Sequence, residues 1–314
     1  MKIKNLIATL TSILLTSVAL AGCSIPSNEV GGDPEKLSFA GIAFGSDIDT
    51  YDSYKLLIEV LQDELGMSVE YYETSSYSAI VEGLISGQVQ IAQMNQLSYV
   101  LATKKLSDLD LVGVSAASAK GPLTAFGYGI KRADNASVDS LEDLRGKTVC
   151  FSDPLSTTGY LTPAKALFDI GIDPDPINSK DIEPVFVGGF LEVGFAVQRG
   201  DCEVGFLNDL TFSTLLPETG KVAEGELEAF WTSPNIPNPP LVISGQLSEQ
   251  LRNKIKAIVL SKGNRTALVE AGYCTDEASC TLIASNRWGW LEETDEAFAV
   301  IRETCVVLNI KECN

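Results

Sequence analysis

Short apolar segments alternate with amphipathic helical segments along most of the chain. In the first third, strand-like segments are expected at 37–42, 69–72, 89–92 and 109–115. Apolar positions with helical spacing lie between these strands, at 54–65, 77–85 and 97–103. This strand–helix–strand order is typical of an α/β fold with doubly wound, mostly parallel sheets.

The same alternation restarts after Gly121-Pro122. Strands are expected at 126–130, 147–151, 183–187 and 203–206, and helices at 141–144, 158–170 and 191–198. A Pro-rich break at 233–240 follows, and three further helices are expected at 248–260, 266–271 and 292–307.

The two breaks isolate a central block of the chain. They predict a discontinuous lobe 1, formed by 37–122 plus 242–314, and a lobe 2 formed by 123–241. The chain would then cross between the lobes twice, near 121–126 and 231–241. Ligands of open α/β sheets bind beyond the carboxyl ends of strands, so the cleft between the lobes is the expected site.

The N-terminus has the features of an export signal. Lys2 and Lys4 precede a largely apolar run, which is too short to favour a permanent membrane span. The sequence Leu20-Ala21-Gly22-Cys23 resembles a bacterial lipobox, so 1–22 is predicted to be a lipoprotein signal peptide and Cys23 the lipidated N-terminus. The alternative is an ordinary signal peptide with a chance cysteine. Residues 23–36 are polar, contain Gly and Pro, and indicate a flexible tether on a protein facing the periplasm or the cell exterior.

The charge and the absence of histidine exclude several classes of protein. The formal net charge of −19 disfavours nucleic acid and anionic lipid headgroups as partners. Without histidine, a Ser-His-Asp triad and a His-ligated zinc site are impossible. Asp47-x-Asp49 starts like a calcium loop but lacks its later ligands, so no metal and no cofactor are expected.

Six cysteines remain once Cys23 is set aside. An even number in an exported chain indicates disulfides, and no CxxC pattern points to a redox or zinc site. Cys150 and Cys202, each near the start of a predicted strand, are expected to pair. The other four, Cys274, Cys280, Cys305 and Cys313, would then pair among themselves.

The segment 151–160, FSDPLSTTGY, combines a strand end, a Pro break and a helix start. Ser156, Thr157 and Thr158 would place three hydroxyl groups beside the free N–H groups of the helix start, which is suited to an anion without Lys or Arg. The competing interpretation is an ordinary capped helix after a strand, since hydroxyl caps are common.

A longer segment around this motif carries a family resemblance. LEDLRGKTVCFSDPLSTTGYLTP, residues 141–163, resembles the phosphonate-binding (PhnD-like) family of ABC-transporter substrate-binding proteins. Segments 76–80, 91–100, 203–209 and 236–241 resemble further family segments in the same order. The resemblance covers roughly 37–265 and implies a two-lobed, type II-like periplasmic-binding-protein fold, no catalysis, and delivery of an oxyanion-bearing ligand to a membrane permease.

The resemblance also implies a set of ligand-binding residues. Ser156, Thr157 and Thr158 would hold the oxygens of a phosphonate-type group, and Asn208 or Asp209 would contact the far end of the ligand. The opposite wall would come from Tyr77 and from the segment with Gln93, Asn95 and Tyr99. The alternative for Tyr77 and Tyr99 is an ordinary aromatic on a helix face, and for Asp209 a helix cap.

One position departs from the family pattern. A histidine often follows two small residues where this chain has Gly188-Gly189-Phe190. Phe190 removes a donor worth about 1.5–3 kcal/mol to an anion and offers an apolar ring instead. A smaller or less charged oxyanion, or one with an apolar substituent, is therefore expected.

The sequence as a whole predicts a lipid-anchored, extracytoplasmic binding protein of an ABC importer, for a phosphonate or phosphite-class oxyanion. A monomer is the default for this fold. Two alternatives keep the fold: a binder of a sulfonate or of a phosphate-bearing vitamin, and a sensory module. An exported hydrolase with paired carboxylates is the alternative from another class, and it predicts turnover instead of stoichiometric binding.

Overall fold

The computed structural model describes residues 32–42, 50–74, 76–283 and 287–313. The predicted signal peptide, Cys23, most of the tether and the Asp47–Asp49 segment lie outside the described residues. Within the described ranges, no helix is both long and apolar enough to cross a membrane.

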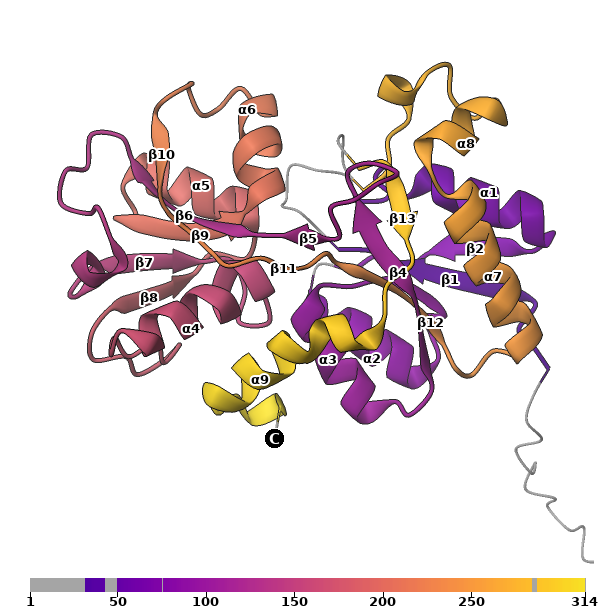
Figure 1. Cartoon of the computed structure of the whole chain (residues 1–314), viewed down its shortest axis with the longest axis horizontal. Coiled ribbons are helices and arrows are strands. Elements are labelled where there is room, and N and C mark those ends of the chain that lie inside the picture. The colour runs from indigo at the N-terminus through magenta and orange to yellow at the C-terminus, as the bar shows by residue number, and fades with distance from the viewer. Residues whose placement is uncertain (1–31, 43–49, 75, 284–286, 314) are drawn as a thin grey trace, which may run out of the picture. The chain divides into compact units, whose positions relative to one another are not determined.

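The first of two large sheets has six strands in the order β13-β4-β12-β3-β1-β2. Their bounds are β1 Lys36–Ala40, β2 Ser68–Tyr71, β3 Ile91–Gln93, β4 Leu109–Ala116, β12 Pro240–Ser244 and β13 Gly289–Leu291. The accompanying helices are α1 Lys55–Leu65, α2 Tyr77–Ser86, α3 Gln96–Lys105, α7 Glu249–Lys262, α8 Arg265–Glu270 and α9 Ala299–Val307. We call these elements the six-stranded lobe (Figure 1).

The second sheet has five strands in the order β10-β6-β9-β7-β8. Their bounds are β6 Gly127–Arg132, β7 Thr148–Phe151, β8 Glu183–Phe186, β9 Val204–Asn208 and β10 Leu227–Thr232. Its helices are the 3-10 helix η1 Leu141–Leu144, the π-helices η2 Thr157–Leu161 and η3 Thr211–Leu215, and the α-helices α4 Thr162–Asp169, α5 Phe190–Arg199 and α6 Leu216–Glu218. We call these elements the five-stranded lobe.

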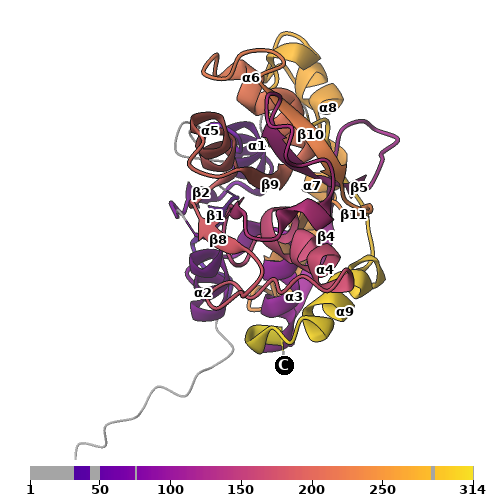
Figure 2. The same ribbon diagram turned by 90° about the vertical axis from the view of Figure 1, so that its left-hand side faces the viewer.

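Two short strands connect the lobes. β5 (Thr124–Ala125) and β11 (Ile236–Pro237) pair antiparallel as a separate two-stranded sheet, which lies between the two large sheets in Figure 1. The two strands also lie next to each other in Figure 2. Asn238 strengthens this link, because its Nδ2 donates to the carbonyl oxygens of Ser115, at 2.7 Å, and Pro122, at 3.0 Å. Both crossings of the chain are thus hydrogen-bonded to each other.

The α/β class with two sheets is confirmed, and both sheets are mixed. β1 pairs in parallel with β2 and β3, and β7 pairs in parallel with β8 and β9. Antiparallel pairs involve β12 and β13 in one sheet and β6 and β10 in the other. Among these strands, β12 directly follows a crossing and enters its sheet against the direction of its neighbours.

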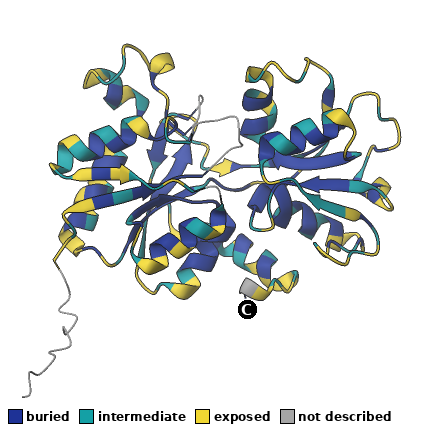
Figure 3. Cartoon of the chain, turned by 180° about the vertical axis from the view of Figure 1, so that it is seen from behind, coloured by how far each residue is buried: buried dark blue, intermediate teal, exposed yellow. Residues whose placement is uncertain are grey.

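The core follows the apolar faces that the sequence predicts. In α1, Leu57, Ile58 and Leu61 are buried, and Tyr54 just before the helix packs on Phe39 of β1 with ring centroids 5.1 Å apart. Each such side chain contributes roughly 1.5–3 kcal/mol through burial. Figure 3 shows the same division across the molecule, with buried residues along the strands and exposed ones on loops and outer helix faces.

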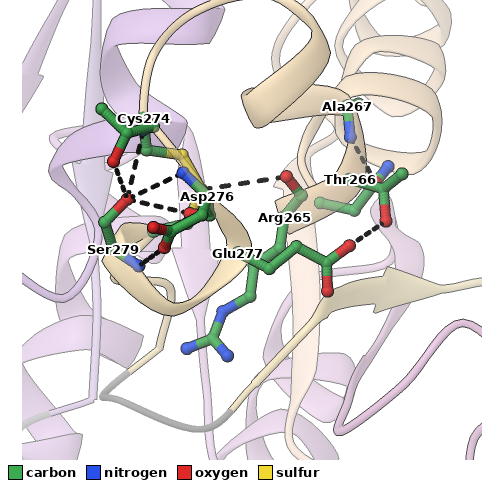
Figure 4. The surroundings of a disulfide bond; sticks show 10 residues. Arg265, Thr266, Ala267, Cys274, Asp276, Glu277 and Ser279 are labelled. Atoms are coloured by element: carbon green, nitrogen blue, oxygen red, sulfur yellow. Dashed lines mark hydrogen bonds between the residues drawn. A yellow bond between two sulfur atoms is a disulfide. The ribbon is translucent and has the colours of Figure 1, made fainter.

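Three disulfides join the six cysteines as expected. Cys150 of β7 pairs with Cys202 before β9, and the other pairs are Cys274–Cys280 and Cys305–Cys313. Figure 4 shows Cys274 beside the 3-10 helix η4 (Glu277–Ser279), where the N–H of Ser279 donates to Asp276 Oδ1 at 2.8 Å. Cys274–Cys280 and Cys305–Cys313 close short local loops, whereas Cys150–Cys202 spans 52 residues.

Candidate ligand-binding site

A small cavity of about 40 Å³ lies between the two lobes, with walls from both. The six-stranded lobe supplies the side chains of Ile42, Tyr77, Asn95, Gln96, Ser115, Pro239, Ile283 and Arg287. The five-stranded lobe and the crossing β5 supply Ala125, Ser156, Thr157, Thr158, Phe190, Asn208, Asp209 and Leu210. Of the ten ligand-binding residues predicted from the sequence, eight line this cavity.

The helix start after β7 forms one wall. β7 ends at Phe151, and Ser156 caps η2 because its Oγ accepts the N–H of Gly159 at 3.0 Å. Ser156, Thr157 and Thr158 are all buried. The first N–H groups of a helix have no acceptor within it, so the N–H groups of Thr157 and Thr158 remain available beside the hydroxyls. π-Helical turns are frequent at functional sites.

A second helix start, from the other lobe, meets the first. Asn95 caps α3 by accepting the N–H of Ser98 at 2.8 Å, and its Nδ2 donates to the carbonyl oxygen of Leu155 at 3.1 Å. The N–H of Leu97 donates to Thr157 Oγ1 at 3.0 Å. The Thr157 hydroxyl is therefore an acceptor for the protein, and its own hydrogen is left to donate. Both helix dipoles favour negative charge here.

Tyr77 closes the cavity on the side of α2. Burial raises the pKa of its hydroxyl above the ordinary range, as does the nearby Asp153 carboxylate, while hydrogen bonding by the Asn95 and Ser156 side chains counteracts this. The hydroxyl therefore stays neutral at physiological pH and keeps a hydrogen to donate. It adds a donor without adding a charge.

Phe190 packs directly on the η2 helix start. A Cβ added to Gly159 would lie 3.0 Å from Phe190 Cε1, 2.8 Å from Ser156 Oγ and 2.0 Å from Ser152 Oγ. Gly159 is thus the residue that lets the ring and both hydroxyls approach the same backbone. Phe190 is only 5% exposed and gives this part of the cavity an apolar wall.

Asn208 and Asp209 lie where β9 ends. Asn208 Oδ1 accepts the N–H of Thr211 at 2.7 Å, which holds the side chain in place. Burial raises the pKa of the Asp209 carboxyl, and the charge of Arg287 counteracts this. Arg287 Nη2 lies 3.8 Å from Asp209 Oδ2, and the same burial lowers the pKa of the Arg287 guanidinium. This pair joins the two lobes across the cavity.

Gln93 and Tyr99 do not line this cavity. Gln93 accepts the indole N–H of Trp290 at 2.6 Å and donates to the carbonyl oxygen of Pro239 at 2.8 Å. Tyr99 donates to Asp295 Oδ1 at 2.7 Å and packs on Phe298, with ring centroids 4.7 Å apart. Both side chains hold the six-stranded lobe together.

Three polar residues of the cavity are not among the residues predicted from the sequence: Gln96, Ser115 and Arg287. Gln96 follows the predicted site residue Asn95 directly, so its place in the same segment was a signal. Ser115 ends a predicted strand, so its place at a strand end was a signal. Arg287 follows no motif, and its position depends on the pairing of β13 with β4.

The chain is similar to known proteins over most of its length. Residues 39–285 match the family described as "ABC transporter, phosphonate, periplasmic substrate-binding protein". The chain is 30% identical over 305 residues to the "Phosphate-import protein PhnD" of Mycolicibacterium smegmatis, covering 96% of this chain and 95% of that one. It is 23% identical to the "Phosphonates-binding periplasmic protein" of Escherichia coli, covering 87% of this chain and 81% of that one.

Solved structures share the fold at lower identity. PhnD1 of Prochlorococcus marinus, in complex with methylphosphonate, has a TM-score of 0.74 at 18% identity, covering 88% of this chain and 99% of that one. A binding-protein component of an ABC phosphonate transporter from Pseudomonas aeruginosa has a TM-score of 0.69 at 21% identity, covering 88% and 87%. These similarities show the fold of a periplasmic binding protein.

Proposed function

The chain belongs to the family of periplasmic substrate-binding proteins of phosphonate ABC transporters, and from this premise we propose that it binds a small phosphorus oxyanion between its lobes. The observation that carries the proposal is the start of η2, whose three hydroxyls and free N–H groups line the cavity between the lobes. Phosphate, phosphite and methylphosphonate are the candidate ligands. This class is supported by two similar proteins, the phosphate-import protein of Mycolicibacterium smegmatis and PhnD1 of Prochlorococcus marinus in complex with methylphosphonate.

The size of the cavity favours a small ligand. The cavity volume of about 40 Å³ is small for a ligand site. That room suits a tetrahedral oxyanion with at most a small substituent. A phosphate-bearing vitamin would require the lobes to open further, so it is the weaker candidate.

The positions of the residues that line the cavity support one set of contacts. Ser156, Thr157 and Thr158 would hold the oxygens, and Tyr77 and Asn95 would complete this end from the opposite lobe. Phe190 would pack against an apolar substituent on the phosphorus atom of the ligand. Asn208 or Asp209 would contact the far end of the ligand. A buried donor left without an acceptor is costly, so an analogue that lacks one oxygen should bind poorly.

The transport cycle would use both lobes. Lobes 37–122 plus 242–314 and 123–241 would rotate about the crossings near 121–126 and 231–241, close on the ligand and present the closed form to an ABC permease. We propose no catalytic step. Acylation at Cys23 would hold the protein at a membrane, facing the periplasm or the cell exterior. Cys23→Ser should release the protein from washed membranes, and retention would contradict the anchor.

Thermal shift and calorimetry on residues 34–314 test the ligand class. The panel is phosphate, phosphite, methylphosphonate, longer phosphonates, a phosphate ester and methanesulfonate. A ligand at a hundredfold over its dissociation constant adds about 2.7 kcal/mol and moves the melting temperature by several degrees. Binding of a small phosphorus oxyanion with a stoichiometry of one supports the proposal. A response only to methanesulfonate or only to the ester would contradict it, as would product formation.

A further inference from the structure

We propose that Arg287, with Ser115 beside it, forms a cationic wall of the binding cavity and contacts the oxyanion from the lobe opposite the hydroxyl triplet. This inference rests on the proposed function and specifies the charge of its ligand: the site would favour the doubly ionised form. It assigns the charge recognition to a residue outside the matched family region, which ends at residue 285.

The backbone fixes Arg287 at the cavity. The N–H of Trp288, the next residue, donates to the carbonyl oxygen of Ala116 at 2.8 Å, and Gly289 pairs with Ala116 where β13 joins β4. The Arg287 side chain lines the cavity and is only 10% exposed. The backbone pairing thus fixes the Cα of Arg287 at the wall of the cavity.

The donors of Arg287 are not used within the protein that the structure describes. Its nearest acid, Asp209, lies 3.8 Å away, beyond hydrogen-bonding distance, and the described residues accept no other bond from its side chain. Burying a cation is expensive unless it is paired and hydrogen-bonded. A single carboxylate at this distance neutralises the charge of Arg287 only in part. It leaves the five N–H donors of the guanidinium without an acceptor among the described residues.

Ser115 is an independent indication of a ligand at the same wall. It is 1% exposed and lines the cavity, and its hydroxyl has no hydrogen-bond partner among the described residues. Buried polar groups in folded proteins are nearly always paired, so an unpartnered one in a cavity points to a bound group. An oxyanion oxygen would satisfy Ser115 and Arg287 together.

Arg287 also changes the ligand charge that is expected from the presence of Phe190. The loss of a charge-capable donor at that position predicts a less charged ligand, but Arg287 supplies a cation in the same cavity. Because the hydroxyl triplet lies on the five-stranded lobe and Arg287 on the six-stranded lobe, one ligand would bridge the two lobes. Charge on the ligand would then favour closure directly.

The competing explanation is that Arg287 only neutralises Asp209. A double-mutant cycle distinguishes these roles. We would measure the affinity of phosphate and methylphosphonate for Arg287→Gln, Arg287→Lys, Asp209→Asn and the Arg287→Gln/Asp209→Asn double variant. Arg199→Gln is the control, since it removes an exposed arginine that is also paired with an aspartate. Melting temperatures without ligand show whether each variant is folded.

If Arg287 contacts the ligand, Arg287→Gln weakens binding by about tenfold to a hundredfold, the range for a hydrogen bond to a charged group. Arg287→Lys keeps the charge but loses the planar fork, so its loss should be smaller. The double variant should remain weak, because Asp209→Asn cannot replace the lost cation. Recovery of affinity in the double variant would overturn the proposal.

The pH dependence gives a second readout. Titration from about pH 5.5 to about pH 8.5 crosses the second ionisation of a phosphate-type group, near 6 for an ester. Among the described residues, the titratable groups that line the cavity with Arg287 are Asp209 and Tyr77, so the comparison is repeated in the Asp209→Asn background. The loss caused by Arg287→Gln should grow with pH, and an equal loss at both ends would contradict the proposal. If the wild-type protein binds no phosphorus oxyanion, the proposed function itself is wrong.

Discussion

The N–H of Leu97 in the first turn of α3 donates to Thr157 Oγ1 at 3.0 Å, so two helix starts on different lobes meet at one hydroxyl. The bond is buried. The Thr157 hydroxyl therefore has two roles. Its oxygen accepts a hydrogen bond from the other lobe, and its hydrogen would donate to the ligand.

Thr157→Val should therefore weaken binding of the cognate oxyanion by about tenfold or more, since it removes a donor to a charged group. The melting temperature of the ligand-free protein should also fall, because the buried N–H of Leu97 loses its acceptor. Thr157→Ser keeps the hydroxyl and should retain most of both properties. Calorimetry and thermal melts on the two variants check this, and equal affinity of Thr157→Val and wild type would place the site elsewhere.

Gly159→Ala should lower both stability and affinity. The added Cβ would lie 2.0 Å from Ser152 Oγ and 2.8 Å from Ser156 Oγ, so the helix start must shift. Overpacking of this kind costs about 1–3 kcal/mol. Adding Ser152→Ala removes the nearest atom and should restore part of the melting temperature. A Gly159→Ala variant that melts and binds like the wild type would contradict the described approach of Phe190 and Ser156.

The two disulfides Cys150–Cys202 and Cys274–Cys280 should differ in their contribution to stability. In the chain-entropy description, closing a loop with a separation of 52 residues is worth about 4 kcal/mol, against about 2.4 kcal/mol for a separation of 6. Paired Cys→Ala variants of each disulfide, compared by denaturant unfolding, measure the difference. A larger loss for Cys274–Cys280 would show that strain or local packing outweighs loop closure.

Acid should loosen the segment between α4 and β8. The N–H of Asp173 donates to Asp181 at 2.8 Å and, with Arg145, lowers the pKa of the Asp181 carboxyl below its ordinary 3.8. A lowered folded-state pKa gives stability that is present above the unfolded pKa and lost as pH falls through the folded value.

Asp181→Asn should therefore melt below wild type at neutral pH, and the two melting temperatures should converge as pH falls below about 3.8. Asp201→Asn, which removes an exposed carboxylate beside Arg199, is the matched control. A gap between Asp181→Asn and wild type that persists at the acid end would mean that the amide disrupts the turn for other reasons.

The sequence predicts the repeated elements of the fold well. The strand expected at 109–115 is β4, and the helix expected at 77–85 is α2, because local periodicity and caps determine both. It does not predict β12, because this short strand directly follows the Pro-rich break and its place in the sheet is set by pairing with β3 and β4. Pairing between distant segments leaves no local pattern.

The same reason explains the candidate site. The hydroxyl triplet is contiguous in sequence and carries its own cap, so it is visible as a motif. Tyr99 lies on a predicted helix like Tyr77, but its hydroxyl bonds Asp295, which is 196 residues away. Arg287 reaches the cavity only through the pairing of Gly289 with Ala116. Neither outcome follows from helical spacing.

The pairing of β5 with β11 limits how the lobes can move. Ala125 pairs with Ile236 and Thr124 with Pro237, and the N–H of Asn238 donates to the carbonyl oxygen of Leu123 at 2.9 Å. Two segments bonded in this way must travel together, so sliding and shearing of one lobe past the other would break several hydrogen bonds, whereas rotation about the paired segments would not. We expect one opening angle to describe the motion, which a single interlobe distance measured in solution could follow.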